Sequence, residues 1–281
     1  MDGAGNAISI FNFIIESFGF IQLARDFENE FERYQLKLDV IQLRISRWGE
    51  ASGLIHDNSN ESSAPQHVDS GASKRSTADG TSGAENIPKE KMVEEILVTI
   101  RDTLVRAQRN ATRMKTGLTT NNSQPLDPNL HIPSDLKRMR TRILGILDKR
   151  RIQKNQVVDS VKWAFYKRDQ FERFIADVSS LTDELEKLAP PGSPERLHNI
   201  SNEECKGLNK PNLEELKEIA EGCDPWLEGA VEKALTQRQG SDSYTITQSY
   251  NTGMVTGVHH GDIKGVSNGN NNAITNHWGR A

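Results

Sequence analysis

The chain has 281 residues, of which 35% are hydrophobic and 26% are charged, and its net charge is −4 at pH 7. This length allows one or two domains, and the small net charge does not require a nucleic-acid or membrane partner. The two cysteines, Cys205 and Cys223, exclude a disulfide framework and a four-ligand zinc site. Together with the lack of an evident secretory signal, they indicate reduced thiols in an intracellular protein.

The N-terminal segment, residues 1–24, is almost uncharged, and from residue 3 onward Glu16 is its single charge. As one helix, residues 3–24 would extend roughly 33 Å, close to the ~30 Å hydrocarbon core of a bilayer. Interspersed Asn, Ser and Gln residues leave two interpretations open: a buried first helix of a bundle, or a segment that inserts into a membrane when released. The candidate membrane-insertion residues are Ile8, Ile10, Phe11, Phe13, Ile14, Ile15, Phe18, Phe20 and Ile21.

From Arg25 the pattern becomes clearly helical, because apolar residues recur at spacings of three and four. These residues are Phe27, Phe31, Tyr34, Leu38, Ile41, Ile45 and Trp48, and charged side chains are expected on the opposite face. Residues 56–87 then become rich in Ser, Gly, Asp and Asn. They cannot bury enough apolar surface to offset the entropy of ordering, so we predict a disordered loop.

Helical spacing resumes at Pro88 and continues to about Met114, and a second loop covers residues 116–133. Ser134 is predicted to cap the next helix. Further helical pieces follow, with apolar positions at Val157, Val161, Ala164 and Phe165, then through residues 171–188 and within 212–235. Strand-like alternation is absent before residue 240. The sequence therefore predicts an all-α bundle of six or so helices.

No catalytic constellation is present, and we predict that the protein is not an enzyme and holds no cofactor or metal. The chain lacks an H-E-x-x-H zinc motif, a Walker A phosphate loop and a Gly-x-Ser-x-Gly nucleophile elbow. Three glutamate pairs, at residues 94–95, 203–204 and 214–215, lie on amphipathic pieces and are predicted to be solvated.

A basic cluster lies within residues 137–154, where Asp148 is the single acidic residue. Such a helix face attracts anionic lipid by about 1 kcal/mol per basic residue near the surface, or remains solvated beside acidic neighbours. No aromatic residues interleave with it, which disfavours nucleic acid as a partner. The anionic-lipid candidates are Lys137, Arg138, Arg140, Arg142, Lys149, Arg150 and Arg151.

The C-terminal tail, residues 236–281, differs from the helical body. Glycine recurs at every fourth position from Gly253, and apolar residues are spread between the glycines. A period of four excludes collagen, and the intervening charges exclude a membrane-helix glycine face. A flexible linker and a cross-β stack both remain open. The candidate amyloid residues are Gly253, Val255, Gly257, Val258, Gly261, Ile263, Gly265, Val266 and Gly269.

Three stretches carry a resemblance to a known family: "FIQLARDFENEFERYQLKLDVIQLRISRWGEA" at 20–51, "MVEEIL" at 92–97 and "WAFYKRDQFERFIADVSSLTDELEKL" at 163–188. In these stretches the chain resembles the HeLo domain of fungal heterokaryon-incompatibility proteins, the group that includes the small-s/large-S prion pair. The resemblance implies a HeLo-like helical domain at 1–235, followed by a prion-forming or amyloid signalling tail at 236–281. The tail resembles the short glycine-spaced amyloid motifs more than a two-rung solenoid repeat.

The resemblance implies a membrane-permeabilising executor of fungal programmed cell death. Templated amyloid folding of the tail would release the N-terminal segment into the plasma membrane. The implied partners are further copies of the chain, a nucleotide-binding receptor with a matching motif, and membrane lipids. The implied location is the cytoplasm when inactive and the cell membrane on activation. The alternative is a soluble helical adaptor or prion-inhibition protein without pore activity.

Overall fold

The computed structural model describes residues 3–55, 88–118, 124–150 and 162–239. Within these ranges the chain forms nine α-helices, one 3-10 helix and a two-stranded sheet, which confirms a predominantly helical fold. The elements are α1 (Gly3–Phe18), β1 (Ile21–Leu23), η1 (Arg25–Glu30), α2 (Phe31–Ala51), α3 (Lys89–Thr116), α4 (Pro128–His131), α5 (Ser134–Lys149), β2 (Trp163–Phe165), α6 (Arg168–Leu188), α7 (Ser193–Cys205), α8 (Lys210–Ala220) and α9 (Pro225–Gln239).

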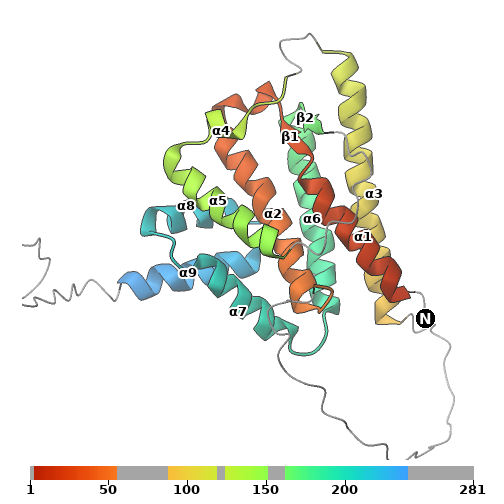
Figure 1. Ribbon diagram of the computed structural model, residues 1–281, viewed down its shortest axis with the longest axis vertical. Helices are drawn as coiled ribbons and strands as arrows, with labels where there is room; N and C mark the ends of the chain where they lie inside the picture. The colour runs from red at the N-terminus through yellow and green to blue at the C-terminus, as the bar shows by residue number, and fades with distance from the viewer. Residues whose placement is uncertain (1–2, 56–87, 119–123, 151–161, 240–281) are drawn as a thin grey trace, which may run out of the picture.

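Helix α2 is the centre of the bundle. Sixteen of its 21 residues are buried, and they include the charged residues Asp39, Arg44 and Arg47. Figure 1 shows α1 and α3 on one side of α2, and α7, α8 and α9 on the other. Helix α6 runs beside both α2 and α3, and α5 covers a further face of α2. Every residue of α2 from 38 to 49 is buried, so the polar side chains of this stretch must be paired or desolvated.

The small parallel sheet is the main departure from the sequence prediction. Strand β1 pairs with β2 in the register Ile21 with Trp163 and Leu23 with Phe165. Residues 1–24 therefore do not form one helix, and Ala164 and Phe165 are not helical. All three β2 residues are buried. Such short apolar runs fit a buried strand or a buried helix equally well, which is why periodicity alone misassigned them.

Two helix starts differ from the sequence prediction. Helix α5 begins at Ser134 with Pro133 at the N-cap and no side-chain cap, so Ser134 is not the capping residue. Helix α7 was predicted only in so far as the glutamate pair at 203–204 was placed on an amphipathic helix, and no bounds were predicted for it. Three of its buried positions, Ser193, Ser201 and Glu204, are polar, and they hide the apolar spacing that marks a helix.

Candidate functional site

The candidate membrane-insertion residues lie on α1 and β1, except Phe20 in the turn between them, and α1 packs against α2 and α3 (Figure 1). Their side chains mostly face the core rather than solvent. Phe13 is the exception, with 42% of its surface exposed. Ile8 and Phe20 are half-buried. The buried members are Ile10, Phe11, Ile14, Ile15, Phe18 and Ile21.

Phe11 anchors α1 to the last turns of α2. Its ring is buried, and its centroid lies 6.1 Å from that of Trp48 in a tilted arrangement. A Cβ atom placed on Gly49 would overlap the Phe11 ring, so the missing side chain at Gly49 lets the two helices approach. The Trp48 indole donates a hydrogen bond to the Leu185 carbonyl at 3.0 Å, which fixes the other ring of the pair.

Polar contacts hold both ends of α1. The Gln42 side chain donates a hydrogen bond to the Ile15 carbonyl at 2.9 Å, which satisfies an acceptor in the last turn of the helix. Near the start of α1, the Asn6 amide donates to the Glu94 carboxylate on α3. These contacts orient α1 without neutralising any buried charge.

Backbone hydrogen bonds hold the chain that follows α1. Outside the ladder itself, the Trp163 amide donates to the Phe20 carbonyl at 3.1 Å, and the Ala24 amide donates to the Phe165 carbonyl at 3.0 Å. The Leu126 amide donates to the Leu23 carbonyl at 2.8 Å. Residues 20–24 are thus paired on two sides. Within the described ranges, no helix combines the length and hydropathy that crossing a bilayer requires.

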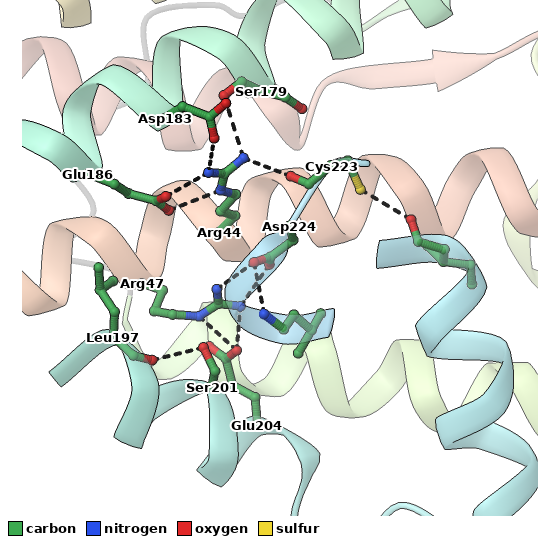
Figure 2. A network of polar contacts seen from close by, with 12 residues as sticks. Arg44, Arg47, Ser179, Asp183, Glu186, Leu197, Ser201, Glu204, Cys223 and Asp224 are labelled. Atoms are coloured by element: carbon green, nitrogen blue, oxygen red, sulfur yellow. Dashed lines mark hydrogen bonds and ion pairs between the residues drawn. The ribbon is translucent and has the colours of Figure 1, made fainter. Parts of the chain in front are cut away.

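Two buried arginines on α2 join it to the C-terminal half of the bundle (Figure 2). The Arg44 guanidinium donates to the Glu186 carboxylate on α6 at 2.6 and 3.0 Å. It also donates to Asp183 and, at 2.9 Å, to the Cys223 carbonyl between α8 and α9. One side chain of α2 thus binds groups on two segments that are distant in sequence, α6 and the corner between α8 and α9.

Arg47 lies one turn further along α2 and is fully buried. It donates to Glu204 on α7 at 2.6 and 2.9 Å, and to Asp224 at 2.8 and 2.9 Å. Burial alone lowers the pKa of Arg47, but the Asp224 and Glu204 carboxylates outweigh it and raise the pKa above its ordinary value. Glu204 is therefore a buried ion-pair partner, and the prediction of a solvated pair at 203–204 was wrong for it.

The basic cluster on α5 divides into paired and exposed members. Arg140 binds the buried Asp39 at 2.8 Å, and Arg142 donates to the Glu203 and Glu204 carbonyls, both at 3.2 Å. Arg150 binds Glu50, and also Glu204 at 2.7 Å. These three arginines brace the fold.

The other described candidates of the cluster lie at the surface of α5. Lys137, Arg138 and Lys149 are exposed on α5. Arg151 lies outside the described residues. The structure thus leaves three of the seven anionic-lipid candidates open to solvent.

The two thiols lie at the edge of the arginine network and are buried. Burial raises the pKa of each to about 12, and the neighbouring carboxylates, Glu204 for Cys205 and Asp224 for Cys223, act in the same direction. Both are therefore protonated at neutral pH. In the part of the chain that the structure describes, no group of three or more His, Cys, Asp or Glu residues is arranged to hold a metal.

The helical part of the chain, up to residue 219, is similar to known proteins. A family profile described as "HeLo: Prion-inhibition and propagation" matches residues 3–219, more than half of the chain. The chain belongs to the HeLo family. Its helical bundle is therefore a HeLo domain, and its family is one of heterokaryon-incompatibility and cell-death proteins.

Two curated relatives come from Podospora anserina. Heterokaryon incompatibility protein s is 27% identical over 242 residues, covering 86% of this chain and 75% of the relative. Heterokaryon incompatibility protein S is 26% identical over the same coverage. A solved structure of the HET-s N-terminal domain superposes with a TM-score of 0.69 at 22% identity, covering 83% of this chain and 99% of that domain. It supports the HeLo fold assignment.

The sequence prediction missed the network that holds the HeLo domain together. Arg44, Arg47 and Asp224 were not singled out, although the two arginines interrupt an apolar run of α2, and Glu204 was singled out only as part of a solvated pair. That interruption was the available signal. The predicted amyloid residues, from Gly253 to Gly269, and the predicted disordered loop at 56–87 lie outside the described residues.

Proposed function

We propose that this HeLo protein permeabilises membranes to execute fungal programmed cell death, in heterokaryon incompatibility or an immunity-like response. Residues 1–24 act as the membrane-insertion segment once they leave the bundle. Templated amyloid folding of the tail at 236–281 acts as the trigger. The observation that carries this proposal is the packing of α1, a helix of marginal hydropathy whose apolar face is buried in a seat formed by α2 and α3.

Release of the segment requires more than undocking α1. Helix α1 has 16 residues, and so is about 24 Å long, less than the ~30 Å hydrocarbon core. If β1 leaves β2 and continues the helix to Ala24, the segment reaches roughly 33 Å. Once β1 has left β2, its backbone N–H and C=O groups have no partner in lipid. Continuing the helix through β1 would satisfy these groups within the segment, which favours the change.

We propose partners at both ends of the chain. The tail assembles with further copies and with a nucleotide-binding receptor that carries a matching motif. The exposed basic residues on α5, Lys137, Arg138 and Lys149, attract anionic lipid at the inner face of the plasma membrane. The protein would then be cytoplasmic while α1 is docked and would move to the cell membrane on activation.

A vesicle leakage assay tests the proposal. Full-length protein, seeded with fibrils of the tail, is added to dye-loaded vesicles that contain anionic lipid. Phe13→Lys is the informative variant, because Phe13 is exposed and a lysine there leaves the docked bundle intact. A charge in the middle of an inserted helix costs about 3 kcal/mol, so leakage is expected to fall strongly while fibrils still form.

Leu130→Lys is the matched control. Leu130 lies on α4, outside the segment, and is 78% exposed, so this variant should leak like the unaltered chain. Equal leakage by both lysine variants would contradict insertion of residues 1–24. No leakage by the unaltered seeded chain would favour the adaptor alternative.

A further inference from the structure

The corner between α8 and α9, residues 221–224, meets both buried arginines of α2 (Figure 2). Its Cys223 carbonyl accepts from Arg44 at 2.9 Å, and its Asp224 carboxylate accepts two hydrogen bonds from Arg47 at 2.8 and 2.9 Å. Asp224 also accepts from the Leu227 amide at 3.1 Å and so caps the first turn of α9. The start of α9 is therefore bound to α2 through a fully buried charge pair.

The same stretch of α2, residues 42–49, holds α1. Gln42 binds the Ile15 carbonyl, Trp48 packs against Phe11, and Gly49 provides the space that the Phe11 ring needs. Arg47 directly precedes Trp48 and Gly49 in the chain. Two helical turns of α2 thus contact α1 on one side of the bundle and the corner between α8 and α9 on the other.

We infer that residues 42–49 of α2 couple the packing of α9 to the docking of α1. If α9 moves away, Arg47 loses Asp224 and is left in the core with one of its two carboxylates. Leaving a buried charge partly unpaired is costly, so α2 must shift until water reaches the guanidinium. Because Trp48 and Gly49 follow Arg47 directly, that shift displaces the surface on which Phe11 packs.

This inference deepens the proposed function, and the biological role of the coupling rests on that function. Helix α9 ends at Gln239 and so includes the first residues of the tail at 236–281, and whatever moves the tail therefore acts first on α9. The coupling itself is a property of the folded chain and needs neither fibrils nor membrane. Coupling between two sites is reciprocal, so undocking of α1 weakens the packing of α9 by the same factor by which undocking of α9 weakens the docking of α1.

Hydrogen–deuterium exchange of the full-length chain, followed by mass spectrometry, measures the opening of each helix separately. The test variant is Asp224→Asn, which keeps the shape and the cap acceptor and removes the charge that pairs with Arg47. The control is Glu221→Gln, an equal charge change at an exposed position of the same corner. Residues 105–116 of α3 serve as the internal reference.

With Asp224→Asn, exchange is expected to accelerate roughly tenfold in α9 and to accelerate in α1 as well, while the reference residues keep their rate. Glu221→Gln should change none of them. Faster exchange in α9 with no change in α1 would overturn the coupling. An equal acceleration of all three helices would also overturn it, because the network would then serve only the global stability of the bundle.

The reciprocal experiment perturbs α1 and does not depend on the folding of Asp224→Asn. Phe11→Ala removes the buried anchor, and Phe13→Ala changes the exposed neighbour on the same helix. Phe11→Ala is expected to accelerate exchange in α9, and Phe13→Ala is not. An unchanged α9 in Phe11→Ala would refute the inference. A failure of the leakage assay would leave these exchange results intact, so the two proposals fail separately.

Discussion

At the scale of single residues, the bundle is specified by charges in its core. Arg44 and Arg47 are buried on a helix that is otherwise largely apolar, and each binds two acidic side chains. A buried ion pair adds little net stability compared with a well-packed apolar pair, but removing one partner is strongly destabilising. The network therefore acts mainly by making one arrangement of α2, α6, α7 and α9 much better than its alternatives.

The first prediction concerns Arg47. Arg47→Ala leaves the Asp224 and Glu204 carboxylates in the core without their shared partner, and should lower the free energy of unfolding by about 3–5 kcal/mol. Urea denaturation followed by circular dichroism measures the change. Arg33→Ala is the control, because the Arg33–Glu218 pair is exposed at 3.4 Å and should contribute less than about 1 kcal/mol. Similar losses in both variants would contradict the role assigned to Arg47.

The second prediction concerns the thiols. Burial raises the pKa of Cys205 and Cys223 to about 12, so neither forms an appreciable amount of thiolate at pH 8. A thiol-reactive disulfide reagent should therefore modify no cysteine in the folded chain at this pH, and two after denaturation. Raised pKa values also mean that stability falls as pH rises from about 8.5, the unfolded value, toward 12. Rapid reaction of one thiol in the folded chain would show that its surroundings open.

At the scale of elements, the position of α1 depends on a missing side chain on its neighbour. Gly49 is helical and costs about 1 kcal/mol relative to alanine in helix propensity, yet it lets the Phe11 ring fit against α2. The segment that we propose to enter the membrane is thus held by shape as well as by apolar burial. The segment can therefore remain marginally hydrophobic, because its close packing against α2 helps to hold it in the bundle.

The third prediction follows from that fit. In Gly49→Ala the new methyl group overlaps the Phe11 ring, and such overpacking costs about 1–3 kcal/mol. We expect α1 to detach more often, so that limited proteolysis cuts within residues 6–24 faster than in the unaltered chain. Gly145→Ala on α5 is the control, because its added Cβ meets open space and gains the same helix propensity. Equal protection of α1 in the two variants would contradict the role of Gly49.

At the scale of the whole molecule, the HeLo body and the tail are predicted to have separate tasks. The body accounts for the family match at residues 3–219, and a solved structure of another HeLo domain matches 83% of the chain. The tail lies beyond that match. A body that forms its own core should fold without the tail, while a signal from the tail must pass through α9 to reach the body.

The fourth prediction separates these tasks. Deletion of residues 240–281 should leave the thermal melting of the body unchanged and abolish induced killing when the chain is expressed in a fungal host. A chain with a scrambled tail of the same composition is the control, and it should also be inactive because its residues no longer stand opposite identical residues of the matching motif on the proposed receptor. Full killing by the truncated chain would show that the tail is not the trigger.

The sequence by itself determined the helical class, most helix positions and the family. Apolar spacings of three and four report which face of a helix is buried, and that property is local in the chain. The sequence also showed that residues 1–24 are mainly apolar but are interrupted by polar residues. Periodicity failed at Ile21–Leu23 and Trp163–Phe165, because a three-residue strand is too short to show its period.

Only the tertiary structure decided which charges lie inside. Arg47 and Asp224 are 177 positions apart, so nothing local to either residue indicates that they meet. The same holds for Gly49, whose importance appears only when Phe11 is placed against it. A charge is expected at the surface unless a partner accompanies it into the core, and only the folded arrangement of α2, α7 and α9 supplies that partner.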